Sequence, residues 1–154
     1  MTSNLITTKE LCNVRVMGGK NASKRIGKVR AFVYHPKERR CIGIMVKRPD
    51  LLWMFHRKDL FVSLDGFEFE DGRVVLADDA KTRDTAACKA IDVRLDDCVI
   101  WGGMPVITES GTTLGTVGVV TFSLVTGKVE SFLVDTGATA NALLGTRSVP
   151  GDLV

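Results

Sequence analysis

The chain has 154 residues and a net charge of +3, with 45% hydrophobic and 25% charged residues. This composition excludes a disordered protein, and the longest apolar-rich run, 98–107, is too short to cross a membrane as a helix. The first residues carry neither the basic nor the apolar region of a secretory signal, so we expect a cytoplasmic protein without membrane insertion.

The first predicted element is a single helical turn. Thr7 and Glu10 fit a capping box, so the turn should cover 7–11 and cap the entry to the fold. Runs rich in β-branched and aromatic residues then predict strands, separated by turns that contain Gly, Asn or Asp. In the first half these strands are 14–17, 26–34, 41–47, 60–64, 67–70 and 73–76.

The middle of the chain connects two similar halves. The apolar run within 48–58 is too short to separate helix from strand, and we expect an irregular connection there. Residues 77–90 are mostly polar and lack apolar periodicity, which predicts a linker. In the second half a lead-in over 91–100 precedes predicted strands at 104–108, 117–125 and 128–135.

One 21-residue pattern occurs twice. Ile26-Gly27-Lys28-Val29 returns as Leu114-Gly115-Thr116-Val117, and the register then holds without a gap at a spacing of 88. Apolar positions recur in the same order, as two copies of one β-unit would require to bury the same face. We therefore predict related conformations for 14–47 and 104–135, in a first unit over 1–76 and a second over 91–154. The second unit is shorter, so strands equivalent to 67–76 are expected to be missing from it. Either the chain is trimmed, or another strand completes the barrel.

The order of these motifs resembles the PRC-barrel family. The first copy has a strand, a glycine turn, the Ile26–Val29 motif, a hairpin loop and the return Ile42-Gly43-Ile44-Met45-Val46. In the second, Met104–Ile107, Leu114–Val117 and Thr126–Val129 follow in the same order. The resemblance implies an all-β fold of two small antiparallel β-barrels in tandem.

The same resemblance implies a docking module. The family is similar to the cytoplasmic domain of the photosynthetic reaction-centre H subunit and to the C-terminal domain of a bacterial ribosome-maturation factor. Both act by binding other macromolecules, and no catalytic residue belongs to the shared motifs. This chain differs from the reaction-centre case in having no membrane helix.

Charge divides unequally between the halves. Residues 1–76 carry 15 Lys and Arg against 8 Asp and Glu, a net charge of +7, whereas 77–154 carry 6 against 10, a net charge of −4. Lys28 and Arg30 alternate with small apolar residues and should project from one face of a strand. Either this face is simply solvated, or it binds a polyanion through Lys24, Arg25, Lys28, Arg30, Arg39 and Arg40.

Polyanion binding would be mainly electrostatic and would weaken as salt rises. It makes an RNA- or ribosome-associated factor the alternative function. The second candidate surface is apolar: Trp53, Met54 and Phe55 stand beside basic residues, as at a protein interface, unless they belong to the core. An open sheet edge in the second unit also suits a homodimer.

A catalytic site is the weakest interpretation of the sequence. The stretch 132–139 resembles the active-site strand of retroviral-type aspartic proteases, whose chemistry needs two carboxylates that share one proton. The repeat places Lys47 at the position of Asp135. An aspartic peptidase acting through Asp135-Thr136-Gly137 is thus a minor alternative, and we predict a strand that ends in a turn there.

The sequence carries no motif for a disulfide framework, a zinc site or a nucleotide-binding loop. The four cysteines are too scattered for a disulfide framework or a zinc site, so we expect free thiols. The glycine pairs do not fit a nucleotide-binding loop. We therefore expect no enzyme, no metal and no cofactor, and a binding or scaffolding module whose partner is another protein.

Overall fold

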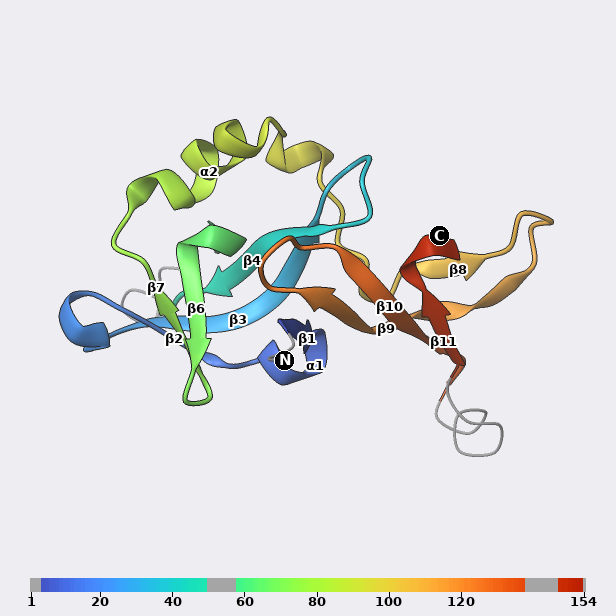
Figure 1. Ribbon diagram of the computed structural model, residues 1–154, viewed down its shortest axis with the longest axis horizontal. Coiled ribbons are helices and arrows are strands. Elements are labelled where there is room, and N and C mark those ends of the chain that lie inside the picture. The colour runs from blue at the N-terminus through green and yellow to red at the C-terminus, as the bar shows by residue number, and fades with distance from the viewer. Residues whose placement is uncertain (1–3, 50–57, 138–146, 154) are drawn as a thin grey trace.

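The computed structural model describes residues 4–49, 58–137 and 147–153 (Figure 1). Strands dominate it and helices are few, so the fold is all-β as predicted. The first sheet has the order β5-β4-β3-β2-β7-β6, and the second has the order β1-β9-β10-β11, with β8 also paired to β9. The strands of the first sheet are β2 (Arg15–Gly18), β3 (Lys24–Tyr34), β4 (Cys41–Lys47), β5 (Leu60–Ser63), β6 (Phe67–Glu70) and β7 (Arg73–Leu76). Those of the second are β1 (Leu5–Thr7), β8 (Pro105–Ile107), β9 (Thr113–Ser123), β10 (Val129–Asp135) and β11 (Arg147–Pro150).

The helices are short. The predicted capping box is present at α1 (Thr8–Leu11): the Glu10 N–H donates to Thr7 Oγ1 at 3.2 Å, and the Thr7 N–H donates to Glu10 Oε2 at 2.8 Å. Within the described residues no helix has the length and apolarity to cross a membrane. The remaining helical pieces are α2 (Asp84–Ile91) and the 3₁₀ turns Lys20–Ala22, Leu64–Gly66, Ala80–Thr82, Leu95–Asp97 and Gly151–Leu153.

The two long hairpins, β3–β4 and β9–β10, pair in the same register. Val29 lies opposite Val46, and Val117 lies opposite Val134. Further along, Tyr34 faces Cys41 and Phe122 faces Val129. Every one of these second-hairpin positions is 88 residues after its first-hairpin counterpart, which is the spacing that the sequence pattern predicts.

Two glycines explain why the pattern repeats at the strand starts. A Cβ on Gly27 would lie 2.0 Å from the carbonyl oxygen of Lys47, and a Cβ on Gly115 would lie 2.4 Å from that of Asp135. Each glycine therefore lets its strand approach the end of the return strand.

The two sheets exchange their lead-in segments. Strand β1 precedes the first sheet in the chain but pairs with β9, where Ile6 faces Phe122. In return Val99, which precedes β8, forms a bridge with Tyr34 of β3. Each sheet is thus completed by a segment that leads into the other.

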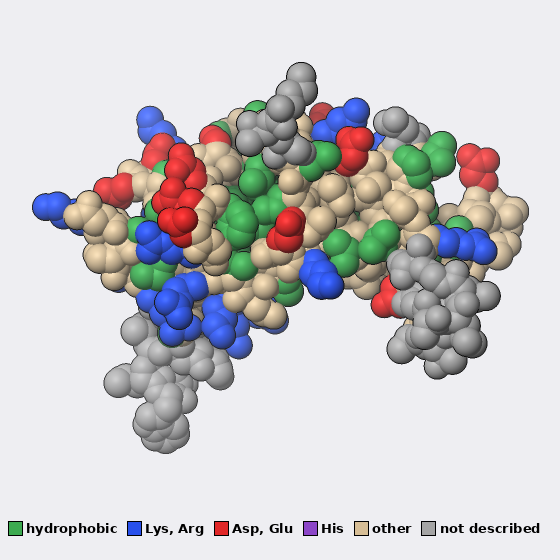
Figure 2. All heavy atoms as spheres, turned by 60° about the horizontal axis from the view of Figure 1, so that its bottom comes forward, with side chains coloured by type: hydrophobic (Ala, Val, Ile, Leu, Met, Phe, Trp, Pro, Cys, Tyr) green, Lys and Arg blue, Asp and Glu red, His purple; other side chains and the backbone are tan. Residues whose placement is uncertain are grey.

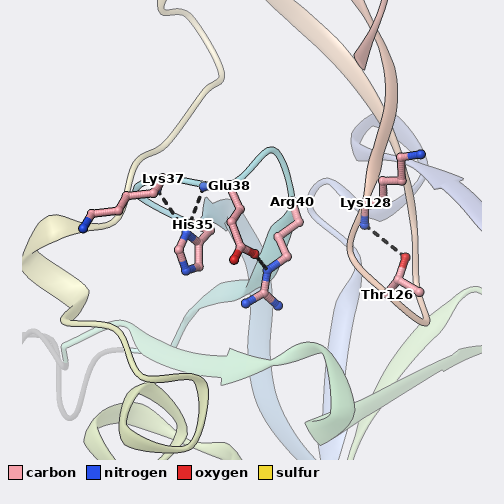
Figure 3. Close-up of polar contacts among 6 residues, drawn as sticks. All are labelled: His35, Lys37, Glu38, Arg40, Thr126 and Lys128. Atoms are coloured by element: carbon pink, nitrogen blue, oxygen red, sulfur yellow. Dashed lines mark hydrogen bonds and ion pairs between the residues drawn. The ribbon is translucent and has the colours of Figure 1, made fainter. Parts of the chain in front are cut away.

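The hairpin turns meet where the sheets join, as Figure 3 shows. The Cys41 N–H donates to the carbonyl of Gly127 at 2.7 Å, and the Val129 N–H donates to the carbonyl of Arg39 at 3.0 Å. Side chains hold each turn locally: Arg40 pairs with Glu38, and the Lys128 N–H donates to Thr126 Oγ1.

One buried core spans both sheets. Its cluster of apolar side chains includes Val29, Tyr34 and Ile44 of the first sheet together with Phe122 and Phe132 of the second. Trp101 stacks on Tyr34, with 4.7 Å between ring centroids, and meets Phe132 edge-on at 6.1 Å. The core therefore ties the two sheets together through aromatic contacts.

Two features of the architecture add to the predicted pattern. The sheets are not antiparallel throughout, because β7 runs parallel to β2 with Val16 opposite Val74. The segment 77–90, expected to be a linker, contains most of α2, whose Ala87 and Cys88 are buried against Val33, Ile42 and Phe61. Alanine and cysteine are weakly apolar, so the helix had no clear periodic pattern in the sequence.

Candidate binding surfaces

A row of basic side chains crosses the outer face of the first sheet. Lys28 on β3 lies opposite Arg15 on β2 and opposite Lys47 on β4. Arg73 continues the row on β7, because β7 is parallel to β2 and Val74 faces Val16. Arg15, Lys28 and Lys47 are exposed and Arg73 is half-buried. We call these four residues the basic row.

Like-charged side chains lie directly opposite each other in the basic row. Like charges directly opposite each other in a sheet are destabilising, and the pairs of Lys28 with Arg15 and with Lys47 both have this geometry. Figure 2 shows many Lys and Arg side chains toward the left of the molecule, the side that the first sheet occupies in Figure 1, with Asp and Glu side chains beside them. An anionic ligand at this face would relieve the repulsion.

The predicted polyanion-binding residues do not form one surface. Lys24 and Arg25 are exposed on the same strand as Lys28. Arg30 forms an ion pair with Asp59 at 3.0 Å. Arg39 and Arg40 lie at the other end of β3, in the hairpin turn, where Arg39 Nη1 donates to the carbonyl of Gly151 at 3.0 Å.

Sequence reasoning missed the cross-strand members of the row. Arg15, Lys47 and Arg73 are isolated in the chain, and strand pairing brings them beside Lys28. The β3–β4 hairpin could have identified Lys47, because the two strands were predicted with nearly these bounds. The candidate interface residues Trp53, Met54 and Phe55 lie outside the described residues.

An apolar groove of about 470 Å³ opens on the second sheet. Glu109 is the one charged side chain among its described lining residues. The large apolar side chains that are exposed along it are Met104, Ile107, Leu114 and Leu153. Exposed apolar side chains gathered in one place mark interaction surfaces more often than scattered ones do.

The corresponding face of the first sheet is covered. By strand register, Val106, Val117, Phe132 and Val149 of the groove correspond to Val16, Val29, Ile44 and Val62. All four first-sheet residues are fully buried, in one cluster with Phe67, Val74 and Leu76 of β6 and β7. Of the four groove residues, Phe132 is buried but the three valines are only half-buried. Within 4–49, 58–137 and 147–153, nothing takes the place of β6 and β7 on the second sheet.

Asp135 lies at the end of β10. Its Oδ1 accepts a hydrogen bond from the Gly137 N–H at 2.9 Å, which is the side-chain-to-backbone turn expected of an aspartate in this position. Lys47 has the corresponding place at the end of β4, opposite Lys28 as Asp135 is opposite Thr116. The described first sheet therefore brings no second carboxylate to this position.

The four cysteines are free thiols that differ in their burial. Burial raises the pKa of the Cys41 thiol from its ordinary 9.0 to about 12. Burial also raises the pKa values of Cys88 and Cys98. A thiol with a raised pKa stays protonated and unreactive near neutral pH, whereas Cys12 is exposed.

Comparison with known families supports the PRC-barrel resemblance in part of the chain. Residues 101–149 match the PRC-barrel domain. The match runs from Trp101 through β8, β9 and β10 into β11, and so includes most of the residues that line the groove. The chain has no significant match among curated proteins.

Proposed function

We propose that this chain is a non-enzymatic docking module made of two PRC-barrel-like units, and that the second unit binds another protein through its apolar groove. One observation carries the proposal: the first-sheet counterparts of the groove positions are buried under β6 and β7, whereas no described residue covers the groove positions in that way. A protein partner is the ligand that matches this surface, because the groove is apolar and nearly uncharged.

The shared hairpin register supports the two-unit arrangement over 1–76 and 91–154. In this arrangement 77–90 connects the units and contains most of α2. The pairing of β1 with β9 and of Val99 with Tyr34 also joins the two units. Lys47 stands in the first unit where Asp135 stands in the second, which supports a role without acid catalysis, since an aspartic peptidase needs a second carboxylate that shares a proton with the first.

The proposal is tested by capture from native cell extract with three forms of the full chain. Ile107→Lys places a charge in the groove, where Ile107 is 56% exposed. Val125→Lys is the matched control, because Val125 is 69% exposed and does not line the groove. We expect a protein that the wild type and Val125→Lys retain and Ile107→Lys loses. Equal capture by all three forms would contradict the proposal.

The basic row favours a second candidate function, an RNA- or ribosome-associated factor. Lys28→Ala combined with Lys47→Ala should weaken binding to a single-stranded RNA and reduce the salt slope by about 1.4, since each phosphate contact contributes about 0.7. Lys37→Ala combined with Lys81→Ala removes two exposed lysines elsewhere and serves as the control. Binding that salt does not change would remove this candidate.

A further inference from the structure

We infer that the groove receives an extended segment of the partner protein, which adds as a strand parallel to β8 and inserts apolar side chains from alternate positions. This inference rests on the proposed function, because it specifies how the same surface binds. The first sheet provides the physical argument, since it contains the filled form of the same arrangement.

The edge of β8 corresponds to the edge that β7 occupies in the first sheet. Strand β2 meets β3 with Val16 opposite Gly27, and β8 meets β9 with Val106 opposite Gly115. On its other edge β2 carries β7 in parallel register. Among the described residues β8 pairs with β9 alone, so its outer edge is available at the place where β7 would lie.

The side chains of β7 indicate what the incoming strand must offer. Val74 and Leu76 are buried in the core, and the alternate residues Arg73 and Val75 are only half-buried. A strand that fills the groove therefore needs two aliphatic side chains two residues apart, with polar residues tolerated between them. Backbone pairing would provide affinity and the two side chains specificity, as in other cases of strand addition.

A second copy of the chain fits this edge less well. Its β6 and β7 are already part of its own first sheet and core. Two β8 edges could pair with each other, but each is three residues long and begins with Pro105, which has no N–H to donate. An extended segment from another protein is not committed to a sheet of its own, and its pairing involves one β8 edge, with one Pro105, rather than two.

A peptide with the sequence of residues 67–76 tests the inference, because it reproduces the hairpin that covers the first sheet. It is titrated into the full ¹⁵N-labelled chain, with amide chemical shifts as the readout. We expect saturable shifts at 104–107 and 114–117, with a Kd between about 10 µM and 1 mM, since a flexible peptide loses conformational entropy on binding. Val125→Lys should retain these shifts, and Ile107→Lys should abolish them.

Two altered peptides test the alternation of side chains. Serine at the positions of Val74 and Leu76 should abolish binding, whereas serine at the position of Val75 should leave the Kd within about threefold, because that position faces away from the groove. No shift at 1 mM peptide, or shifts confined to the first sheet, would overturn the inference. Equal binding of both altered peptides would also overturn it.

Self-association is measured in parallel by sedimentation equilibrium without peptide. A monomer supports the inference, whereas a dimer that Ile107→Lys dissociates would make a second copy the occupant and overturn it. The two proposals can fail separately. If the peptide does not bind but capture from extract still depends on Ile107, strand addition fails and the docking module stands.

Discussion

Gly27 and Gly115 occupy tight backbone contacts between paired strands. A Cβ at either position would overlap a carbonyl oxygen of the return strand, and Gly115 also has a φ of +148°, which side chains rarely adopt. The sequence pattern identified both glycines, because each stands at the head of the repeated motif. It could not identify the oxygen that each contacts, since that depends on strand pairing.

Alanine substitutions at these glycines should destabilise the fold. Gly27→Ala and Gly115→Ala are each expected to lower the free energy of unfolding by about 1–3 kcal/mol, the usual cost of overpacking. Gly102→Ala is the control, because a Cβ there has no atom within 4 Å. Urea unfolding measures the difference. Stabilities of Gly27→Ala and Gly102→Ala within error of each other would contradict the backbone contact.

The buried thiol of Cys41 makes stability depend on alkaline pH. Its pKa is about 12 in the folded chain against an ordinary 9.0, so the unfolded chain loses this proton first as pH rises. The contribution to stability is therefore complete below pH 9 and declines as pH rises from 9 toward 12. Cys41→Ala should flatten this decline in urea unfolding measured from pH 8 to 11. The remaining slope is assigned to Tyr34, Cys88 and Cys98, whose pKa values burial also raises.

The like-charged cross-strand pairs of the basic row should lower the stability of the first sheet. Lys28→Glu would convert two repulsive cross-strand pairs, with Arg15 and Lys47, into attractive ones. We expect the free energy of unfolding to rise by about 0.5–1 kcal/mol at low salt, since each cross-strand pair is worth roughly 0.2–1 kcal/mol. Lys24→Glu is the control, because Lys24 faces Gly18. A gain that persists unchanged in 1 M salt would show that the cause is not charge.

The predicted elements agree with the structure wherever a segment carries its own pattern. Strands β4, β6 and β7 have the predicted bounds, and β3 extends two residues beyond its predicted start. The missed elements carry weak local signals. Strand β1 is three residues long, α2 is buried through Ala87 and Cys88, and β11 is defined by its pairing with β10.

The candidate surfaces, like the elements, could be predicted only where a single segment carries a clear sequence pattern. The sequence predicted that strands equivalent to 67–76 would be missing from the second unit, and among the described residues no such strands occur there. It also placed Lys28 on an exposed face of a strand. It could not predict the groove, because Met104, Ile107 and Leu114 converge only when β8 folds against β9. Nor could it indicate that Asp59, far along the chain, pairs with Arg30.

At the scale of the whole molecule, the shared core and the exchanged lead-in segments make the two sheets one folding unit. Phe122 is fully buried and meets Phe32 of the other sheet at 6.1 Å between ring centroids. Phe122→Ala should cost about 3–5 kcal/mol and should reduce hydrogen-exchange protection in both sheets together. Val125→Ala, at an exposed turn, should change neither sheet. Loss of protection in the second sheet alone would show that the sheets unfold separately.

On the proposed function, the face of the second sheet that the described residues leave uncovered is where this molecule meets another protein. Site-specific photo-crosslinking in native cell extract tests it most directly, with a photoreactive amino acid in place of Ile107 or, as the control, in place of Val125. We expect a discrete crosslink to a different protein from position 107 and none from position 125. Crosslinks from 107 to the chain itself alone, or the same products from both positions, would contradict it.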